Sequence, residues 1–256
     1  MENNIKTEGE FTYLEEGRGP VLVLLHGLMG ALSNFKDVVN HFKSTHTVTI
    51  PIMPLFDIPI ADAGVKPLYE YIRRFIEFKG YKKVSMLGNS LGGHVGLVYA
   101  VNHPDKLNHL ILTGSSGLYE NAFGGSYPKR EDKEFIRKKV EVTFFDPKMA
   151  SDELVDEVFE MLNDRMKLIS IIAIAKNAIR YNMSEELYKI ETPTCLIWGK
   201  NDTITPPEVG EDFKRLIKNS DLYWIDKCGH APMMEHPEEF NGILENWLSK
   251  YPVSES

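Results

Sequence analysis

The 256-residue sequence has only two cysteines, no long hydrophobic run and no excess of positive charge. Cys195 and Cys228 could form at most one bridge, which is no disulfide framework, so we expect both thiols to stay reduced. The longest strongly apolar stretch, Leu168 to Ala175, is too short to cross a bilayer. A net charge of −8 provides no basic surface for nucleic acid or for anionic membranes.

Signals for export, metal binding and cofactor binding are missing as well. Met1 to Glu10 is polar and acidic, whereas a signal peptide has a basic start followed by an apolar run. No H-E-x-x-H, paired-cysteine, G-x-G-x-x-G or P-loop motif occurs. We therefore expect a cytoplasmic globular protein without metal or cofactor. Its expected partner is a small-molecule substrate rather than nucleic acid or a membrane, and nothing indicates the number of subunits.

Short apolar runs alternate with helical patterns over the first 118 residues. Val21 to Leu25 is a continuous apolar run, which is typical of a strand buried on both faces. Further strands are expected at 47–50, 84–87 and 110–113, and helices at 66–79 and 91–101. Parallel strands joined by helical crossovers produce this alternation, so the sequence predicts an α/β fold.

The strand pattern stops at residue 119 and resumes after residue 188. Between them we find only helical stretches, at 131–144, 152–163 and 165–181. Strands at 194–198 and 222–225 and a helix at 237–250 then complete the chain. The sequence thus predicts a core domain of residues 1–118 and 189–256, interrupted by a helical insertion at 119–188.

The pentapeptide Gly88-Asn89-Ser90-Leu91-Gly92 matches G-x-S-x-G between an expected strand and an expected helix. In that context the motif is a nucleophile elbow, whose glycines permit a turn too tight for side chains. The serine takes a strained conformation that lifts its hydroxyl above the edge of the sheet. We therefore predict that Ser90 is a nucleophile.

Two backbone amides are the candidates for an oxyanion hole. His26-Gly27-Leu28 follows the first buried strand, and Leu91 follows the nucleophile. The N–H groups of Leu28 and Leu91 would face the charge that develops on a substrate carbonyl oxygen. We expect His26 to support this loop structurally rather than to take part in catalysis.

A serine hydroxyl needs a base that removes its proton, and eight histidines compete for that role. His230 stands on a loop after the last expected strand, which places it at the carboxyl edge of a parallel sheet beside the elbow. His94 is expected to pack on the surface of its helix, and His236 to start the helix that follows. His230 is therefore the predicted general base.

The third group must be a carboxylate that fixes the histidine tautomer and stabilises the imidazolium. Asp202 follows the strand at 194–198, whereas the preceding strand is followed by Gly114-Ser115-Ser116-Gly117, which contains no carboxylate. Asp221 and Asp226 flank the last strand too close to the loop of His230. The sequence therefore predicts that Asp202 orients His230.

These motifs resemble the α/β-hydrolase superfamily over nearly the whole chain, and the order Ser90, Asp202, His230 is that of the superfamily. The resemblance implies a mostly parallel sheet flanked by helices, with a helical cap inserted after the sixth strand. Gly-Asn-Ser-Leu-Gly-Gly looks like the motif of meta-cleavage-product hydrolases, which break carbon–carbon bonds, and of many small esterases. However, Leu28-Met29-Gly30 replaces the Gly-Pro-Gly loop of the former, and Ala231 replaces an aromatic residue that commonly follows their histidine.

We expect a serine hydrolase that cleaves carboxylic esters of small to medium apolar substrates through an acyl-enzyme. Apolar cap residues suggest a pocket roof, although most of them are expected to form the core of the cap: Phe123, Phe144, Phe145, Phe159, Met161 and Met166. One alternative is hydrolysis of a carbon–carbon bond in a vinylogous diketo acid, with Arg165 or Arg180 binding its carboxylate. The other is a ligand receptor that keeps the triad but turns over slowly.

Overall fold

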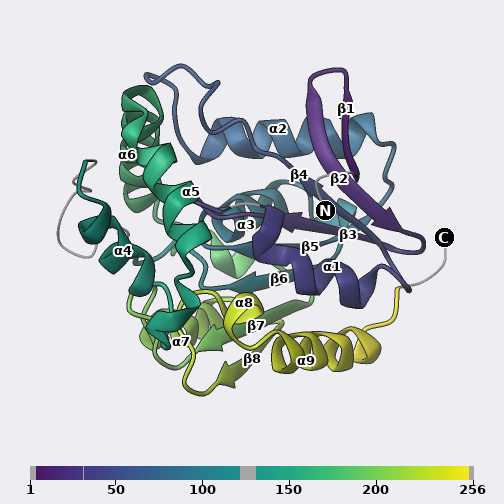
Figure 1. Cartoon of the computed structure of the whole chain (residues 1–256). Helices are drawn as coiled ribbons and strands as arrows, with labels where there is room; N and C mark the ends of the chain where they lie inside the picture. The colour runs from purple at the N-terminus through teal and green to yellow at the C-terminus, as the bar shows by residue number, and fades with distance from the viewer. Residues whose placement is uncertain (1–3, 31, 122–130, 254–256) are drawn as a thin grey trace.

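The computed structural model describes residues 4–30, 32–121 and 131–253, which form an eight-stranded sheet with helices on both faces (Figure 1). In sheet order the strands are β1 (Ile5–Glu8), β2 (Phe11–Gly17), β4 (Thr47–Pro51), β3 (Val21–Leu25), β5 (Val84–Asn89), β6 (Leu107–Thr113), β7 (Thr194–Gly199) and β8 (Ser220–Ile225). The pairs β1–β2 and β2–β4 are antiparallel, and all other neighbours are parallel. The prediction of a mostly parallel sheet is confirmed.

Alternate residues of each central strand pack into two separate cores. In β3, Leu22 and Leu24 face one core, and Val23 and Leu25 face the other. This explains the unbroken apolar run, because both faces of a parallel sheet are covered by helices.

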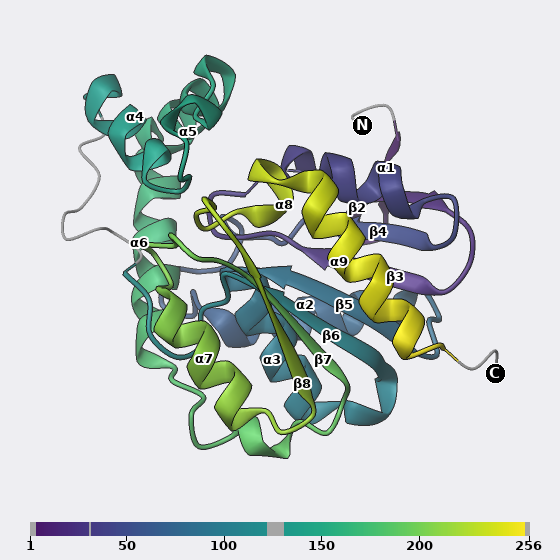
Figure 2. The same ribbon diagram turned by 90° about the horizontal axis from the view of Figure 1, so that it is seen from below.

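Two groups of helices cover these two faces of the sheet (Figure 2). The first face is covered by α1 (Lys36–Phe42), α8 (Pro232–Glu235) and α9 (Pro237–Lys250). The second is covered by α2 (Val65–Phe78), α3 (Leu91–Asn102) and α7 (Pro207–Leu216). Short 3₁₀ helices occur at Leu32–Phe35, Pro104–Lys106, Pro147–Met149 and Leu187–Lys189.

The amino-terminal hairpin was not expected from the sequence. All residues of β1 are exposed, so this edge strand lacks the apolar pattern by which the inner strands are recognised. The next strand, β2, buries Phe11, Tyr13 and Leu14, and it pairs with β4 in antiparallel orientation.

Three helices between β6 and β7 make up the helical insertion: α4 (Lys133–Glu141), α5 (Asp152–Asn163) and α6 (Arg165–Arg180). Each begins at a side chain that accepts hydrogen bonds from the first turn: Asp132, Ser151 and Asp164, respectively. In Figure 2, α4 and α5 stand apart from the sheet at one end of α6. A cap after the sixth strand is therefore present, while its limits at residues 119 and 188 stay a prediction.

No helix among the described residues combines the length and the hydrophobicity that a membrane span requires.

The β5–α3 turn depends on contacts too close for any side chain, which gives a stability prediction. A Cβ at position 92 would collide with the carbonyl oxygen of Leu25, whereas a Cβ at Gly242 in α9 would meet nothing within 4 Å. We expect Gly92→Ala to lower the free energy of unfolding by about 1–3 kcal/mol through overpacking. The matched change Gly242→Ala should raise it by about 0.5–1 kcal/mol, because alanine favours a helix more than glycine does. Urea denaturation measures both; equal effects would contradict the contact argument.

Candidate active site

The turn between β5 and α3 holds Ser90 in a conformation that is unusual for a residue with a side chain. Its φ of 53° lies in the left-handed region. The turn is attached to the loop after β6, because the Ser90 amide donates to the Thr113 carbonyl and the Ser116 amide donates to the Ser90 carbonyl, both at 3.2 Å. Ser90 is thereby exposed to a cavity at the carboxyl edge of the sheet.

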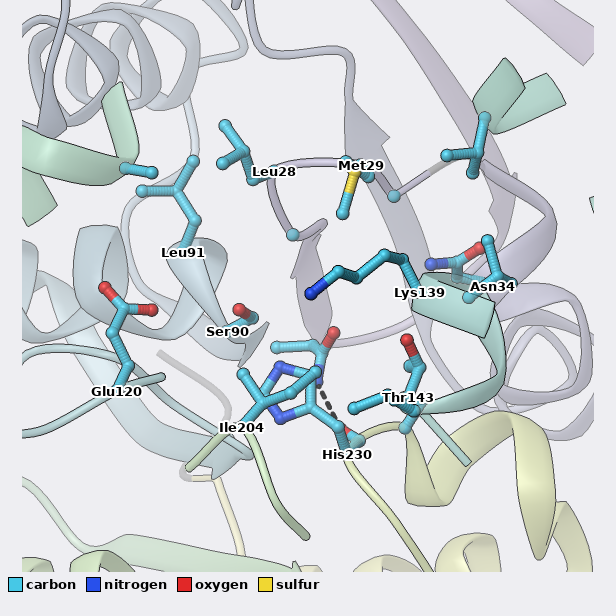
Figure 3. A pocket seen from close by; sticks show the side chains of 18 of the residues that line it. Leu28, Met29, Asn34, Ser90, Leu91, Glu120, Lys139, Thr143, Ile204 and His230 are labelled. Atoms are coloured by element: carbon cyan, nitrogen blue, oxygen red, sulfur yellow. Dashed lines mark hydrogen bonds between the residues drawn. The ribbon is translucent and has the colours of Figure 1, made fainter. Parts of the chain in front are cut away.

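His230 lies on the loop after β8 and lines the same cavity as Ser90 (Figure 3). Its Nδ1 is 2.8 Å from Oδ2 of Asp202, and both side chains are buried. Because an ionised carboxylate can only accept, Nδ1 carries the proton in this contact, which leaves Nε2 as the acceptor. This is the tautomer that a general base toward a serine hydroxyl requires.

Asp202 is held by the residues that follow it in the loop after β7. Its Oδ1 accepts hydrogen bonds from the amides of Ile204 and Thr205 at 2.8 and 2.9 Å. Its Oδ2 accepts the Thr205 hydroxyl at 2.7 Å in addition to His230. Such a carboxylate stays in place because each of its oxygens has hydrogen-bond partners.

The backbone of His230 is tied to the cap and to the elbow. Its amide donates to the Thr143 carbonyl at 2.7 Å, and its carbonyl accepts from Nδ2 of Asn89 at 3.1 Å. The ring lies against Gly114, where a Cβ would come within 2.8 Å of Nδ1. Three separate segments therefore fix the orientation of the imidazole.

The pKa of His230 is raised above its usual value of 6.5. Burial on its own lowers this pKa, because it disfavours the charged form. The charge of Asp202, the hydrogen bond to it and the charge of Glu120 together outweigh that effect. The site therefore stabilises the imidazolium that forms when a serine proton is removed.

The two expected oxyanion-hole residues both line the cavity. A Cβ on Gly27 would lie 3.4 Å from Cβ of Ser90, so the loop that contains Leu28 runs directly beside the serine. Leu91 is the first residue of α3, where a backbone N–H has no acceptor within the helix. Both amides are thus close to the serine at the edge of the cavity.

His26 is buried, and its two ring nitrogens hold the loop in place. Nδ1 contacts the Gly27 carbonyl at 2.9 Å, and Nε2 accepts from the Met53 amide at 3.1 Å. Burial lowers the pKa of His26 and keeps the ring neutral. These contacts agree with a structural role.

The other candidate histidines and carboxylates do not line the cavity of Ser90. The expectation that His94 packs on the surface of its helix is wrong: it is fully buried in α3, and its ring lies 5.3 Å from that of Tyr181. His236 precedes α9, as expected. Asp221 accepts hydrogen bonds from Trp247, and the exposed Asp226 contacts Lys200.

The cavity is lined mainly by apolar side chains, of which many come from the cap: Val140, Val142, Phe144, Leu154, Val158, Leu162, Ile171, Ala175 and Ala178. Of the aromatic and methionine residues expected at the roof, Phe144 lines this cavity, whereas Phe145 and Met166 are exposed. The other expected roof residues lie elsewhere: Phe159 packs in the cap, Met161 lines a second hollow, and Phe123 lies outside the described residues.

Two charged residues of this cavity were not recognised in the sequence. Glu120 follows β6, and Lys139 comes from α4 (Figure 3). Glu120 could have been found, because it follows a strand that ends at the same edge as Ser90. Nothing in the local pattern of α4 distinguishes Lys139. Arg165 and Arg180, which were considered for binding a carboxylate, are exposed and do not line the cavity.

Within residues 4–30, 32–121 and 131–253, no three His, Cys, Asp or Glu side chains are grouped as ligands of a metal ion.

Comparisons with known proteins agree with the fold. The family model described as the alpha/beta hydrolase fold matches residues 20–156 and 160–237. An alpha/beta hydrolase enzyme from the metagenome of sediments from the lagoon of Mar Chica, Morocco, is 47% identical, with a TM-score of 0.80 over 96% of this chain and 98% of that chain. A serine hydrolase involved in carbazole degradation is 28% identical, with a TM-score of 0.80 over 94% of this chain and 95% of that chain.

Among curated relatives, the 2-hydroxy-6-oxo-6-(2'-aminophenyl)hexa-2,4-dienoic acid hydrolase of Metapseudomonas resinovorans is 30% identical, over 94% of this chain and 88% of that protein. Because the family model and this relative both span most of the sequence, the chain belongs to the alpha/beta hydrolase family.

Proposed function

We propose that this protein is a serine hydrolase that cleaves carboxylic esters of small to medium apolar acids through an acyl-enzyme. The observation that supports it most is that the strained Ser90 and His230 line the same apolar cavity, and that His230 is hydrogen-bonded to the buried Asp202. Residues 119–188 act as a cap over the site, and residues 1–118 and 189–256 form the core.

Each residue has a defined role in this proposal. His230 removes the proton of Ser90 as the hydroxyl attacks the ester carbonyl, and Asp202 stabilises the imidazolium. The amides of Leu28 and Leu91 donate to the oxyanion. His230 then gives its proton to the leaving alcohol, and later activates the water that hydrolyses the acyl-enzyme.

A second candidate is hydrolysis of a carbon–carbon bond in a vinylogous diketo acid. It is favoured by the 30% identity to the dienoic acid hydrolase and by Lys139, a cation in the lining of the cavity. Turnover of the purified protein on esters of graded acyl length and on one vinylogous diketo acid separates the two candidates. If each protein molecule reacted only once with every compound and did not turn over further, the result would instead favour a ligand receptor.

Ser90→Ala should abolish covalent labelling by a fluorophosphonate and lower kcat for esters by about 10⁴- to 10⁶-fold. The change Ser116→Ala, in the same cavity, should leave labelling intact. His230→Ala should cost about as much as Ser90→Ala, and the double variant hardly more, because the residues act as a unit. Labelling of Ser90→Ala, measured by mass spectrometry, would refute the nucleophile assignment.

Asp202→Asn should lower kcat/KM by about 10⁴-fold, because the amide favours the wrong tautomer. In the unchanged protein kcat/KM should fall as the pH drops through the raised pKa of His230, above 6.5, since the base must be neutral. Without the Asp202 charge this pKa falls, so the acid limb should move to lower pH. Asp226→Asn, at an exposed carboxylate, is the control and should alter neither kcat/KM nor the pH at which kcat/KM falls on the acid side. A normal rate in Asp202→Asn would assign the role to another carboxylate.

The neighbours Phe144 and Phe145 provide a matched test of the pocket. Phe144 lines the cavity, whereas Phe145 is 45% exposed. Phe144→Ala should change the kcat/KM ratio of long to short acyl esters by about tenfold or more, because a pocket wall discriminates between chain lengths. Phe145→Ala should leave that ratio within about twofold. Equal effects of the two changes would rule out Phe144 as a wall of the acyl site.

A further inference from the structure

Glu120 is a carboxylate in the cavity of Ser90 that the ester mechanism does not use. Its loop is fastened on both sides. The amide of the next residue, Asn121, donates to the Ile204 carbonyl at 2.7 Å. The carbonyl of Gly117 accepts the amide of Met183 at 2.8 Å. The backbone on either side of Glu120 is thus anchored to other segments.

One oxygen of this carboxylate, Oε1, is buried and has no hydrogen-bond partner among the residues that the structure describes. Burial raises the pKa of Glu120 to about 7, although the charge of His230 opposes the shift. Leaving a carboxylate oxygen buried without a donor costs free energy, so such a group calls for an explanation. A bound molecule that brings a donor would supply the missing partner.

Other polar side chains that line the cavity do not require a hydrogen-bond donor on the ligand in the same way. The amide of Asn34 and the hydroxyl of Ser116 also have an oxygen without a partner, and both line the cavity. However, these groups contain both donors and acceptors, so each can bond to either kind of atom. The ionised form of a carboxylate can only accept, and a donor brought by a ligand stabilises that form against the effect of burial, so Glu120 in its ionised form selects for a donor.

The position of Glu120 indicates that the hydrogen-bond donor belongs to the alcohol part of an ester substrate. Glu120 lines the same cavity as His230, and His230 is the group that must reach the leaving oxygen. The acyl chain, in contrast, fits the apolar wall formed by cap residues such as Phe144 and Val158. Figure 3 shows Glu120 and the cap residue Lys139 entering the site from different sides of Ser90.

We propose that Glu120 is a specificity-determining residue that accepts a hydrogen bond from a hydroxyl group on the leaving alcohol, so that the preferred substrates are monoesters of polyols. The inference rests on the proposed ester hydrolysis. It adds no chemical step: Glu120 favours binding and acylation of esters whose alcohol carries a further hydroxyl.

Two butyrate esters test this assignment, because glycerol monobutyrate and propyl butyrate form the same acyl-enzyme and differ in the hydroxyls of the alcohol. The unchanged protein should prefer the glycerol ester in kcat/KM. Glu120→Leu should reduce this preference by about tenfold or more, since a hydrogen bond to a charged group is among the stronger ones. Glu120→Gln, which keeps an acceptor oxygen, should retain part of it. Glu185→Leu makes the same change at an exposed position and should leave the preference as it is.

The ratio of the two esters separates recognition from structural support. Damage to Ser90 or His230 would lower both kcat/KM values by the same factor, and an unchanged ratio in Glu120→Leu and in Glu120→Gln would overturn the proposal. If the Glu120→Leu protein did not fold, Glu120→Gln would be the deciding variant. A fall of about threefold or more in the ratio of the two kcat/KM values would then support the proposal, and a smaller fall would refute it.

Binding to the inactive variant distinguishes failure of this inference from failure of the proposed function. The Kd values of both esters are measured by calorimetry on Ser90→Ala and on Ser90→Ala/Glu120→Gln. If the unchanged protein hydrolyses neither ester but Ser90→Ala binds the glycerol ester more tightly through Glu120, only the ester function is wrong. If Ser90→Ala binds both esters equally, the role of Glu120 is wrong.

Discussion

The tight turn between β5 and α3 is the constraint on which the arrangement of the site depends. A side chain at Gly92 would collide with the backbone of β3, so the start of α3 can approach that strand only as glycine. This approach puts Gly27 against Ser90 and brings the loop of the first strand beside the serine. The neighbouring Asn89 joins the end of β6 and the His230 loop through its side-chain amide. The residues Asn89 and Ser90 at the end of β5 thus contact the loop after β3, the end of β6 and the loop after β8.

The two carboxylates that act on His230 differ in their partners, and this difference separates their roles. Asp202 is buried with hydrogen bonds to both oxygens, and one of these oxygens contacts the imidazole directly. Glu120 faces the cavity, and within the described part of the chain one of its oxygens has no hydrogen-bond partner. In a site of low polarity a fully bonded carboxylate is a fixed negative charge, whereas an incompletely bonded one gains stability from a ligand. In our proposal, a carboxylate therefore orients His230 in one place and recognises the substrate in the other.

Much of the core could be predicted because its signals are local. The apolar run at Val21–Leu25 and the amphipathic helix near 65–78 depend on neighbouring residues alone. The edge strand β1 was missed because an exposed edge strand needs few apolar residues. The strand β2 was also missed, although it buries Phe11, Tyr13 and Leu14. The short helix α1 was missed since its burial against α9 comes from residues about 200 positions away.

The sequence by itself determined the alternation of the inner strands with helices, the glycine-bounded turn around Ser90, and the places of Asp202 and His230 after strands that end at one edge. These features follow from backbone geometry and from short patterns, which act over a few residues. Only the tertiary structure decided that His94 is buried, that Phe144 rather than Phe145 faces the cavity, and that Lys139 joins the site. These outcomes depend on how the cap packs against the core, and contacts between distant segments leave no periodic pattern in the chain.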